Sequence, residues 1–250
     1  LGIVKKENII YGNAKNIDDI LVYVGSKTGN EGINGAAMAS NTFANSNISE
    51  ELKSNVQKSD PFLEKLLLEA CCEIADKKLA DGMQDMGAGG LLCATLEVVK
   101  RGIEKTEIQD LGCEIYLDKV PTKYNMEFNN ILISESQERM LIVANETNLP
   151  KINEIFEKWD LEYAVIGKTV FSSKYEVYHN NKLLYSDNIF NLDSPEDYVN
   201  IPTKYTKVNQ THPIKIKNPH LWTMYDSTVG NRTLKGPDKP GHYAILDIYE

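Results

Sequence analysis

The chain has 250 residues, of which 42% are hydrophobic and 25% charged, and its formal net charge is −9. These proportions predict one large or two small globular domains with a hydrophobic core. The acidic balance argues against nucleic acid as the main partner, because that partner requires a basic face. No apolar run approaches the roughly 18 residues of a membrane span, so we expect no membrane partner. The four cysteines lack zinc-knuckle spacing, which favours free thiols in a reducing cytosol and a cytoplasmic location.

Both ends of the chain have the composition of strands. Leu1–Val4 is apolar and β-branched and begins without methionine, and residues 244–249 are again strand-like. We therefore expect the chain to be an internal piece of a larger protein.

The first strong pattern is the continuous apolar run over residues 20–24, which predicts a strand covered on both faces. A glycine-rich stretch with Lys27 and Thr28 follows over residues 25–37. It is either a loop that binds an anion or a long glycine-rich turn.

A helix is predicted over residues 62–80, with Asp60 as its N-cap, Pro61 in its first turn and Gly82 at its end. A second helix is predicted from about residue 91 to residue 100, ended by Gly102.

The stretch between these helices, residues 84–92, has one carboxylate, Asp85, followed by three glycines in four positions. Glycines allow a tight turn and close approach to a ligand, and the helix that follows directs free N–H groups into that turn. The pattern fits a phosphate site with Asp85 holding a divalent cation. It fits a plain strand-to-helix turn with an acidic cap equally well.

The remaining patterns predict an α+β domain, a mixed or antiparallel sheet with helices on one face. Expected strands cover residues 113–120, 140–143 and 164–167, a hairpin covers 175–185, and helical segments cover 127–132 and 150–159. A polar cluster, residues 133–139, stands directly before the strand at 140–143, as either a surface strand entry or a site. Residues 190–220 are polar and punctuated by prolines, which is typical of a linker.

Several motifs in one order resemble the large synthetase subunit of the phosphoribosylformylglycinamidine synthase family, within the aminoimidazole ribonucleotide synthetase-like superfamily. These motifs are Val22–Gly29, Gly32–Ile33, Gly35–Ala36, Asp60–Ala70, Gln84–Leu91, Leu132–Leu141 and Phe156–Leu161. The resemblance implies a C-terminal-domain-like α+β fold flanked by partial domains. Residues 1–25 would end a first ATP-site half-domain, 26–190 would form the synthetase domain, 191–220 the linker and 221–250 the start of a second repeat.

The resemblance also implies the chemistry: an ATP-dependent carbon–nitrogen ligase that amidates formylglycinamide ribonucleotide during purine biosynthesis. Its ammonia would come from glutamine through an amidotransferase subunit, with a small bridging subunit as a further partner. ATP would be the co-substrate and Mg²⁺ the metal. By position, Gln57, Glu135, Ser136 and Gln137 would bind the ribonucleotide, and Asp85 would be a magnesium ligand.

Some positions depart from the family pattern. Asn30-Glu31 replaces the usual Arg-Asp, Ser59 replaces a glycine, and residues 238–243 lack the usual Gly-Asp-Ala-Ala. The catalytic histidine segment of the family is expected upstream of Leu1, so we predict no catalytic residue in this chain and no activity of the chain alone.

Two alternatives stay open. One is another ATP-using member of the superfamily, similar to selenophosphate synthetase or a hydrogenase-maturation protein; these lack the stretch at residues 135–140. The other is a non-catalytic module for subunit contacts, in which two copies of this chain would form a homodimer.

Overall fold

The computed structural model describes residues 5–33, 58–193, 233–235 and 245–246. The chain divides into two compact units, Leu1–Glu196 and Asp197–Glu250. The described part of the second unit is an antiparallel pair, β8 (Thr233–Lys235) with β9 (Ile245–Leu246). Within the described residues, no helix is both long and apolar enough to cross a membrane.

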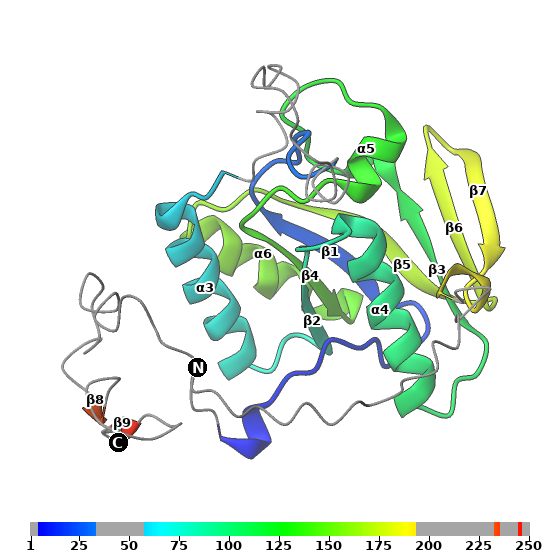
Figure 1. Cartoon of the computed structure of the whole chain (residues 1–250). Coiled ribbons are helices and arrows are strands. Elements are labelled where there is room, and N and C mark those ends of the chain that lie inside the picture. Colours follow the sequence, from blue (N-terminus) through cyan, green and yellow to red (C-terminus); the bar gives the residue numbers. More distant parts are fainter. Residues whose placement is uncertain (1–4, 34–57, 194–232, 236–244, 247–250) are drawn as a thin grey trace, which may run out of the picture. The chain divides into compact units, whose positions relative to one another are not determined.

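The first unit is built on a seven-stranded sheet with the order β2-β4-β1-β5-β3-β6-β7 (Figure 1). Only the β3–β6 pair is parallel, so the sheet is mixed, as predicted. Its strands are β1 (Ile20–Gly25), β2 (Gly82–Asp85), β3 (Leu111–Tyr116), β4 (Arg139–Ala144), β5 (Tyr163–Phe171), β6 (Lys174–His179) and β7 (Lys182–Asn188).

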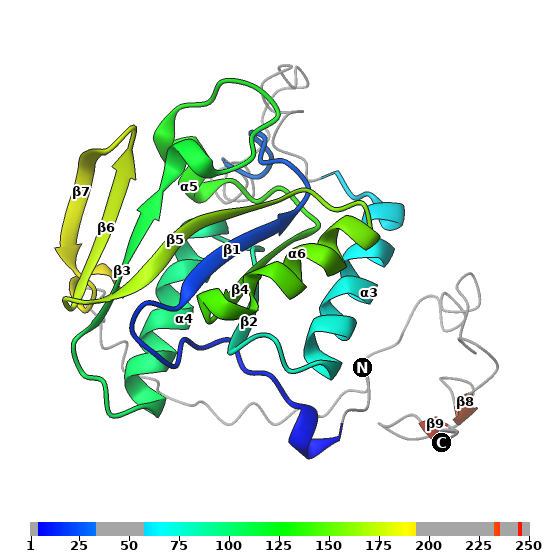
Figure 2. The same ribbon diagram turned by 180° about the vertical axis from the view of Figure 1, so that it is seen from behind.

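Helices cover both faces of this sheet, which corrects the prediction of helices on one face only. Leu21 and Tyr23 of β1 belong to the core cluster that contains α4 (Gly90–Lys105). Ile20, Val22 and Val24 belong to the opposite cluster, which contains α3 (Pro61–Asp76) and α6 (Leu149–Lys158). Alternate residues of a strand face opposite sides, so a continuous apolar run requires cover on both. Figure 2 shows α3 and α6 on the side opposite α4.

The helix ends differ from the prediction for physical reasons. Asp60 caps α3 as expected, because its Oδ1 accepts from the N–H groups of Phe62 and Leu63, both at 3.1 Å. The helix stops at Asp76, however, and Gly82 begins β2 instead of ending the helix. Helix α4 continues through Gly102, where a Cβ would meet the carbonyl oxygen of Ala14 at 2.8 Å. This glycine allows close packing and does not end the helix.

The predicted domain boundary at residue 25 cuts through the sheet. Strand β1 pairs with β4 on one side and with β5 on the other. Residues 20–25 therefore pair within the same sheet as residues 139–144 and 163–171, while the division of the chain into domains stays a prediction. The predicted strand at residues 1–4, nearly all of the linker and Gln57 lie outside the described residues.

Candidate functional site

The candidate site lies at one edge of the sheet, where three polar segments meet. Strand β4 runs antiparallel to its neighbours β1 and β2, and its register places Arg139 opposite Gly25 and Met140 opposite Asp85. The ends of β1 and β2 therefore lie beside the beginning of β4. This topology brings together the loop at residues 26–32, the turn at residues 85–90 and the segment at residues 134–138.

Arg139 connects these three segments. Its side chain is only 3% exposed, and burial lowers the pKa of its guanidinium. The guanidinium donates to the carbonyl oxygens of Ser136 (2.7 Å), Ser134 (2.6 Å) and Met86 (3.3 Å), and to Oγ1 of Thr28 (3.1 Å). One buried side chain thus forms hydrogen bonds with all three segments of the predicted site and holds them together.

Glu135 lies between the two glycine-containing loops. Its Oε1 accepts from the N–H of Gly89 at 3.1 Å, directly before α4 begins. A Cβ on Gly32 would lie within 3 Å of the Cβ, Cγ and Oε2 atoms of Glu135, so the loop that contains Gly32 approaches Glu135 closely. A carboxylate is therefore already present at the N-terminus of α4, where the helix dipole favours an anion.

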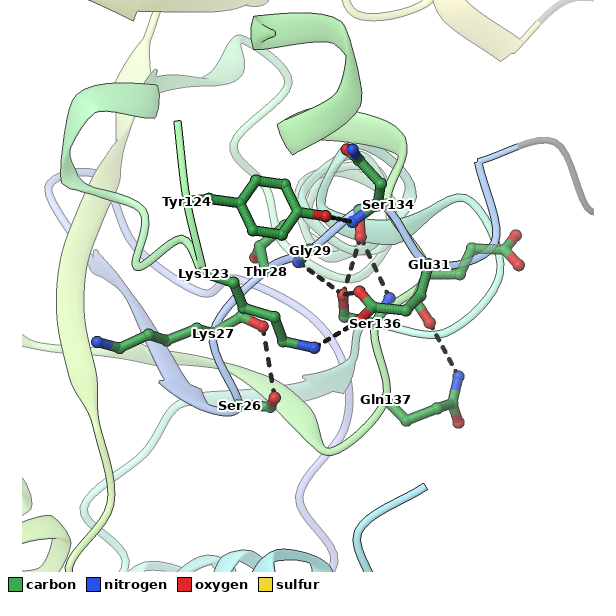
Figure 3. A network of polar contacts seen from close by, with 12 residues as sticks. Ser26, Lys27, Thr28, Gly29, Glu31, Lys123, Tyr124, Ser134, Ser136 and Gln137 are labelled. Carbon is green, nitrogen blue, oxygen red and sulfur yellow. Dashed lines mark hydrogen bonds and ion pairs between the residues drawn. The ribbon is translucent and has the colours of Figure 1, made fainter. Parts of the chain in front are cut away.

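Ser136 is 1% exposed and lies inside a polar network (Figure 3). Its Oγ accepts from the N–H of Gly29 at 2.9 Å and donates to the Glu31 carboxylate. Lys123 donates to the same carboxylate at 2.5 Å. Burial opposes ionisation of Glu31, but the hydrogen bonds from Lys123 and Ser136 outweigh it, and the pKa of Glu31 is lowered. This network holds the loop after β1 against the 134–137 segment.

Gln137 and Asp85 line one pocket of about 250 Å³ between α3 and the sheet edge. Gln137 Nε2 also donates to the carbonyl oxygen of Glu135 at 3.0 Å, and Asp85 is exposed to solvent. The lining combines charged and polar side chains with apolar ones; its residues are Glu64, Leu67, Leu68, Cys71, Asp85, Met86, Gly87, Gln137, Glu138, Arg139 and Met140.

The predicted site residues therefore have different surroundings. Asp85 and Gln137 share the pocket, Glu135 holds the adjacent turn, and Ser136 is buried behind them. The hydroxyl of Ser136 is engaged in hydrogen bonds that position the backbone. Direct contact of each residue with a substrate stays a prediction.

The residues near Asp85 fit a magnesium ion that takes only one or two of its ligands from the protein. Among the described residues, no group of three His, Cys, Asp or Glu side chains could hold a metal. Mg²⁺ commonly uses only one or two carboxylates and takes its other ligands from water and substrate phosphates. The exposed carboxylate of Asp85, in a pocket that Glu64 and Glu138 also line, suits that mode and does not suit a metal bound by protein side chains alone.

The family is decided by the match of residues 16–180 to the model for AIR synthase related protein, C-terminal domain. The chain belongs to this family. The match includes every strand from β1 to β6, and with them all three polar segments of the candidate site.

Curated relatives within the AIR synthase related family agree with the resemblance seen in the sequence. The chain is 37% identical over 274 residues to phosphoribosylformylglycinamidine synthase subunit PurL of Campylobacter curvus, with 100% of this chain and 36% of the relative covered. It is 40% identical over 239 residues to the PurL of Pelagibacter ubique, with 95% and 31% covered. The chain thus spans about a third of the length of these relatives.

A solved structure of Thermotoga maritima PurL complexed with ADP has the same fold. It has a TM-score of 0.72 and 30% identity, and the match covers 94% of this chain and 36% of that one. A structure of the same protein complexed with FGAR has a TM-score of 0.66 and 35% identity, covering 76% and 30%. These comparisons confirm the predicted family resemblance and the α+β class.

Two parts of this family member's site were not predicted. The sequence placed Arg139 only within a polar cluster directly before a strand. A charged residue at the start of an apolar run was the pattern that could have indicated its role. The Glu31–Lys123 pair joins residues 92 apart in sequence. No local pattern could have indicated that contact.

Proposed function

We propose that this chain forms the ribonucleotide-binding part of a phosphoribosylformylglycinamidine synthase, an ATP-dependent ligase that amidates formylglycinamide ribonucleotide. The observation that carries the proposal is the meeting of residues 26–32, 85–90 and 134–138 at one sheet edge, in a chain whose relatives carry this name. The FGAR and ATP complexes of Thermotoga maritima PurL support this substrate and co-substrate.

In this proposal the residues have distinct roles. Gln137 and Glu135 contact the ribonucleotide, together with Gln57. Ser136 contributes its backbone, while its hydroxyl keeps the loop after β1 in place. The buried guanidinium of Arg139 fixes the segment that carries Glu135, Ser136 and Gln137, so less conformational entropy is lost when the ligand binds.

Asp85 would hold magnesium beside the phosphates of the bound nucleotide. When bound, the ion neutralises phosphate oxygens and so assists phosphoryl transfer. The chain's own contribution is the exposed carboxylate of Asp85, in a pocket that Glu64 and Glu138 also line.

The remaining features of the enzyme follow the same proposal. The ammonia comes from a glutamine amidotransferase subunit, with a small bridging subunit as a further partner, and the assembly works in the cytoplasm. With residues 20–25 added to the sheet domain, we retain a linker at 191–220 and a second repeat from residue 221.

The proposal is tested with the complete open reading frame that contains this chain. Purified protein is assayed for amidine formation with formylglycinamide ribonucleotide, ATP, Mg²⁺ and ammonium. We expect turnover, and we expect Gln137→Ala and Glu135→Gln to lower kcat/KM by about tenfold or more, as loss of a hydrogen bond to a ligand does.

Glu176→Gln is the control, because Glu176 lies on β6 and bonds Tyr178 and Ser186, away from the pocket. It should keep the kinetic constants of the unmodified protein. Absence of turnover in the unmodified protein refutes the function, whereas unchanged kinetics in the Gln137 and Glu135 variants refute the site. The 250-residue chain assayed alone should be inactive.

A further inference from the structure

The carboxylate of Asp85 is connected to helix α4 through its neighbour Gln84. Gln84 Nε2 donates to Asp85 Oδ1 at 3.0 Å, and Gln84 Oε1 accepts from Arg101 Nη1 at 2.6 Å. Arg101 Nη2 in turn donates to Glu97 Oε2 at 2.8 Å, one helical turn earlier on α4. A continuous chain of hydrogen bonds therefore runs from Glu97 to Asp85.

The chemistry of Arg101 determines which way the Gln84 amide faces. A guanidinium has donors only, so the atom that Gln84 presents to it has to be the carbonyl oxygen. The amide NH₂ is then left for Asp85 Oδ1. The other carboxylate oxygen, Oδ2, lies toward the glycine turn, where a Cβ on Gly87 would meet it at 3.1 Å. Arg101 thereby holds the Gln84 NH₂ group against one oxygen of Asp85, which leaves the other oxygen on the side of the glycine turn.

A third segment closes this arrangement from outside. Residues 11–14 run beside the edge strand β2, with Met83 N donating to the carbonyl oxygen of Tyr11 at 3.3 Å. A Cβ on Gly12 would overlap Gln84 Oε1 and would lie 2.9 Å from Arg101 Nη1. Only glycine leaves both ends of the Gln84–Arg101 hydrogen bond undisturbed.

We propose that Gln84 and Arg101 are positioning residues that orient the Asp85 carboxylate toward the glycine turn for a divalent cation. The inference rests on the proposed function, which makes Asp85 the metal ligand. Partners that orient a ligating carboxylate commonly change metal affinity by about 10- to 100-fold when they are removed. Because Asp85 is exposed, we place the effect at the lower end of that range.

The test measures Mn²⁺ affinity by electron paramagnetic resonance of the free ion, with the protein of the complete open reading frame. Gln84→Met and Arg101→Met should each weaken Mn²⁺ binding by about tenfold. Arg101→Lys keeps a donor for Gln84 and should restore most of the affinity. Gly12→Ala, which displaces the flexible ends of two side chains, should weaken binding less than either Met variant does.

Electrostatics works against this expectation, which makes the test discriminating. Loss of the positive charge of Arg101 would by itself favour cation binding, so weaker binding has to come from orientation. Lys105→Ala is the matched control: it removes a positive charge from the same helix, where Lys105 contacts the Tyr11 ring at 4.1 Å. Its Mn²⁺ affinity should not fall.

The outcomes separate this inference from the proposed function. If Asp85→Asn loses Mn²⁺ while Gln84→Met and Arg101→Met bind it normally, the positioning role is refuted and the metal assignment stands. If Asp85→Asn keeps full affinity, the metal assignment is refuted. Crystal structures then decide the orienting role: an Asp85 carboxylate that has turned in the Arg101→Met variant supports it, and an unmoved one overturns it.

Discussion

Arg139 and Glu73 each bind several partners, yet they work in different surroundings. Glu73 on α3 accepts from Lys77 and Lys158, both at 2.7 Å, and from the Trp159 ring at 3.1 Å, so it ties α3 to the end of α6. Its hydrogen bonds from Lys158, Lys77 and Trp159 lower its pKa to about 2. Arg139 is buried and donates to uncharged oxygens of three loops.

The comparison teaches that a large pKa shift does not identify the more important group. The Glu73 side chain is 21% exposed, so water can replace its partners and salt screens its charge. Water cannot reach the carbonyl oxygens that Arg139 satisfies, so these would stay unpaired without it. We therefore expect substitutions in the Arg139 cluster to have large effects and those at Glu73 to have small ones.

The largest effect is predicted for Arg139→Met, which preserves most of the side-chain volume. The carbonyl oxygens of Ser134, Ser136 and Met86 lose a donor in a buried place, at a cost of about 3 kcal/mol or more. Urea unfolding measures the loss, and the stability of Arg139→Lys should lie between that of the unmodified protein and that of Arg139→Met. A loss below about 1 kcal/mol would contradict the role of Arg139 as the connection between the loops.

Gly90→Ala should have the next largest effect. Gly90 has a φ of 58°, and a Cβ there would overlap the carbonyl oxygen of Ser134, which Arg139 binds. We expect a loss of about 2–3 kcal/mol from strain and displacement. The matched control is Gly87→Ala, whose Cβ would meet only Asp85 Oδ2, and thermal unfolding should show a much smaller change. Equal losses in both variants would mean that the contact with Ser134 is unimportant.

Glu31→Gln tests the network through its pH dependence. The pKa of Glu31 in the folded state is lower than 4.5, so its stabilising effect is present above that pH and is lost as the pH falls through the folded value. The variant should be less stable by about 1 kcal/mol near neutral pH, because charged hydrogen bonds from Lys123 and Ser136 are weakened.

A urea series at decreasing pH measures this difference. It should shrink below pH 4.5, because the unmodified carboxylate also becomes protonated. A difference that stays constant across the series would show that ionisation of Glu31 does not stabilise the fold.

Local patterns predicted most elements of this fold. The Asp60 cap, the apolar run of β1 and the hairpin of β6 and β7 all follow from sequence spacing. Strand β2 was missed, because four residues with two partly buried side chains carry no clear period. The continuous apolar run of β1 correctly predicted cover on both faces of that strand, whereas the expectation of helices on one face of the sheet was wrong.

The candidate site was predictable only as separate motifs. Their likeness to one family indicated that Asp85 and the 135–137 triplet act together. The contacts that hold them, such as Arg139 to Met86 and Glu31 to Lys123, join residues 53 and 92 apart in sequence. Such contacts depend on strand register, which the turns and the core determine together.

Glu73→Gln should have the smallest effect of the four substitutions. The amide is isosteric, and its one oxygen can still accept from Lys158 and the Trp159 ring while its NH₂ group faces Lys77; water reaches the charges that remain. Trp159 fluorescence reports the α3–α6 contact directly, while urea unfolding measures the whole unit. We expect a slight shift of the unfolding midpoint, smaller than that of Glu31→Gln, which disappears at high salt because exposed charges are then screened. If this variant lost as much stability as Arg139→Met, solvent access would not be what separates the two groups, and the large pKa shift of Glu73 would have been the better guide.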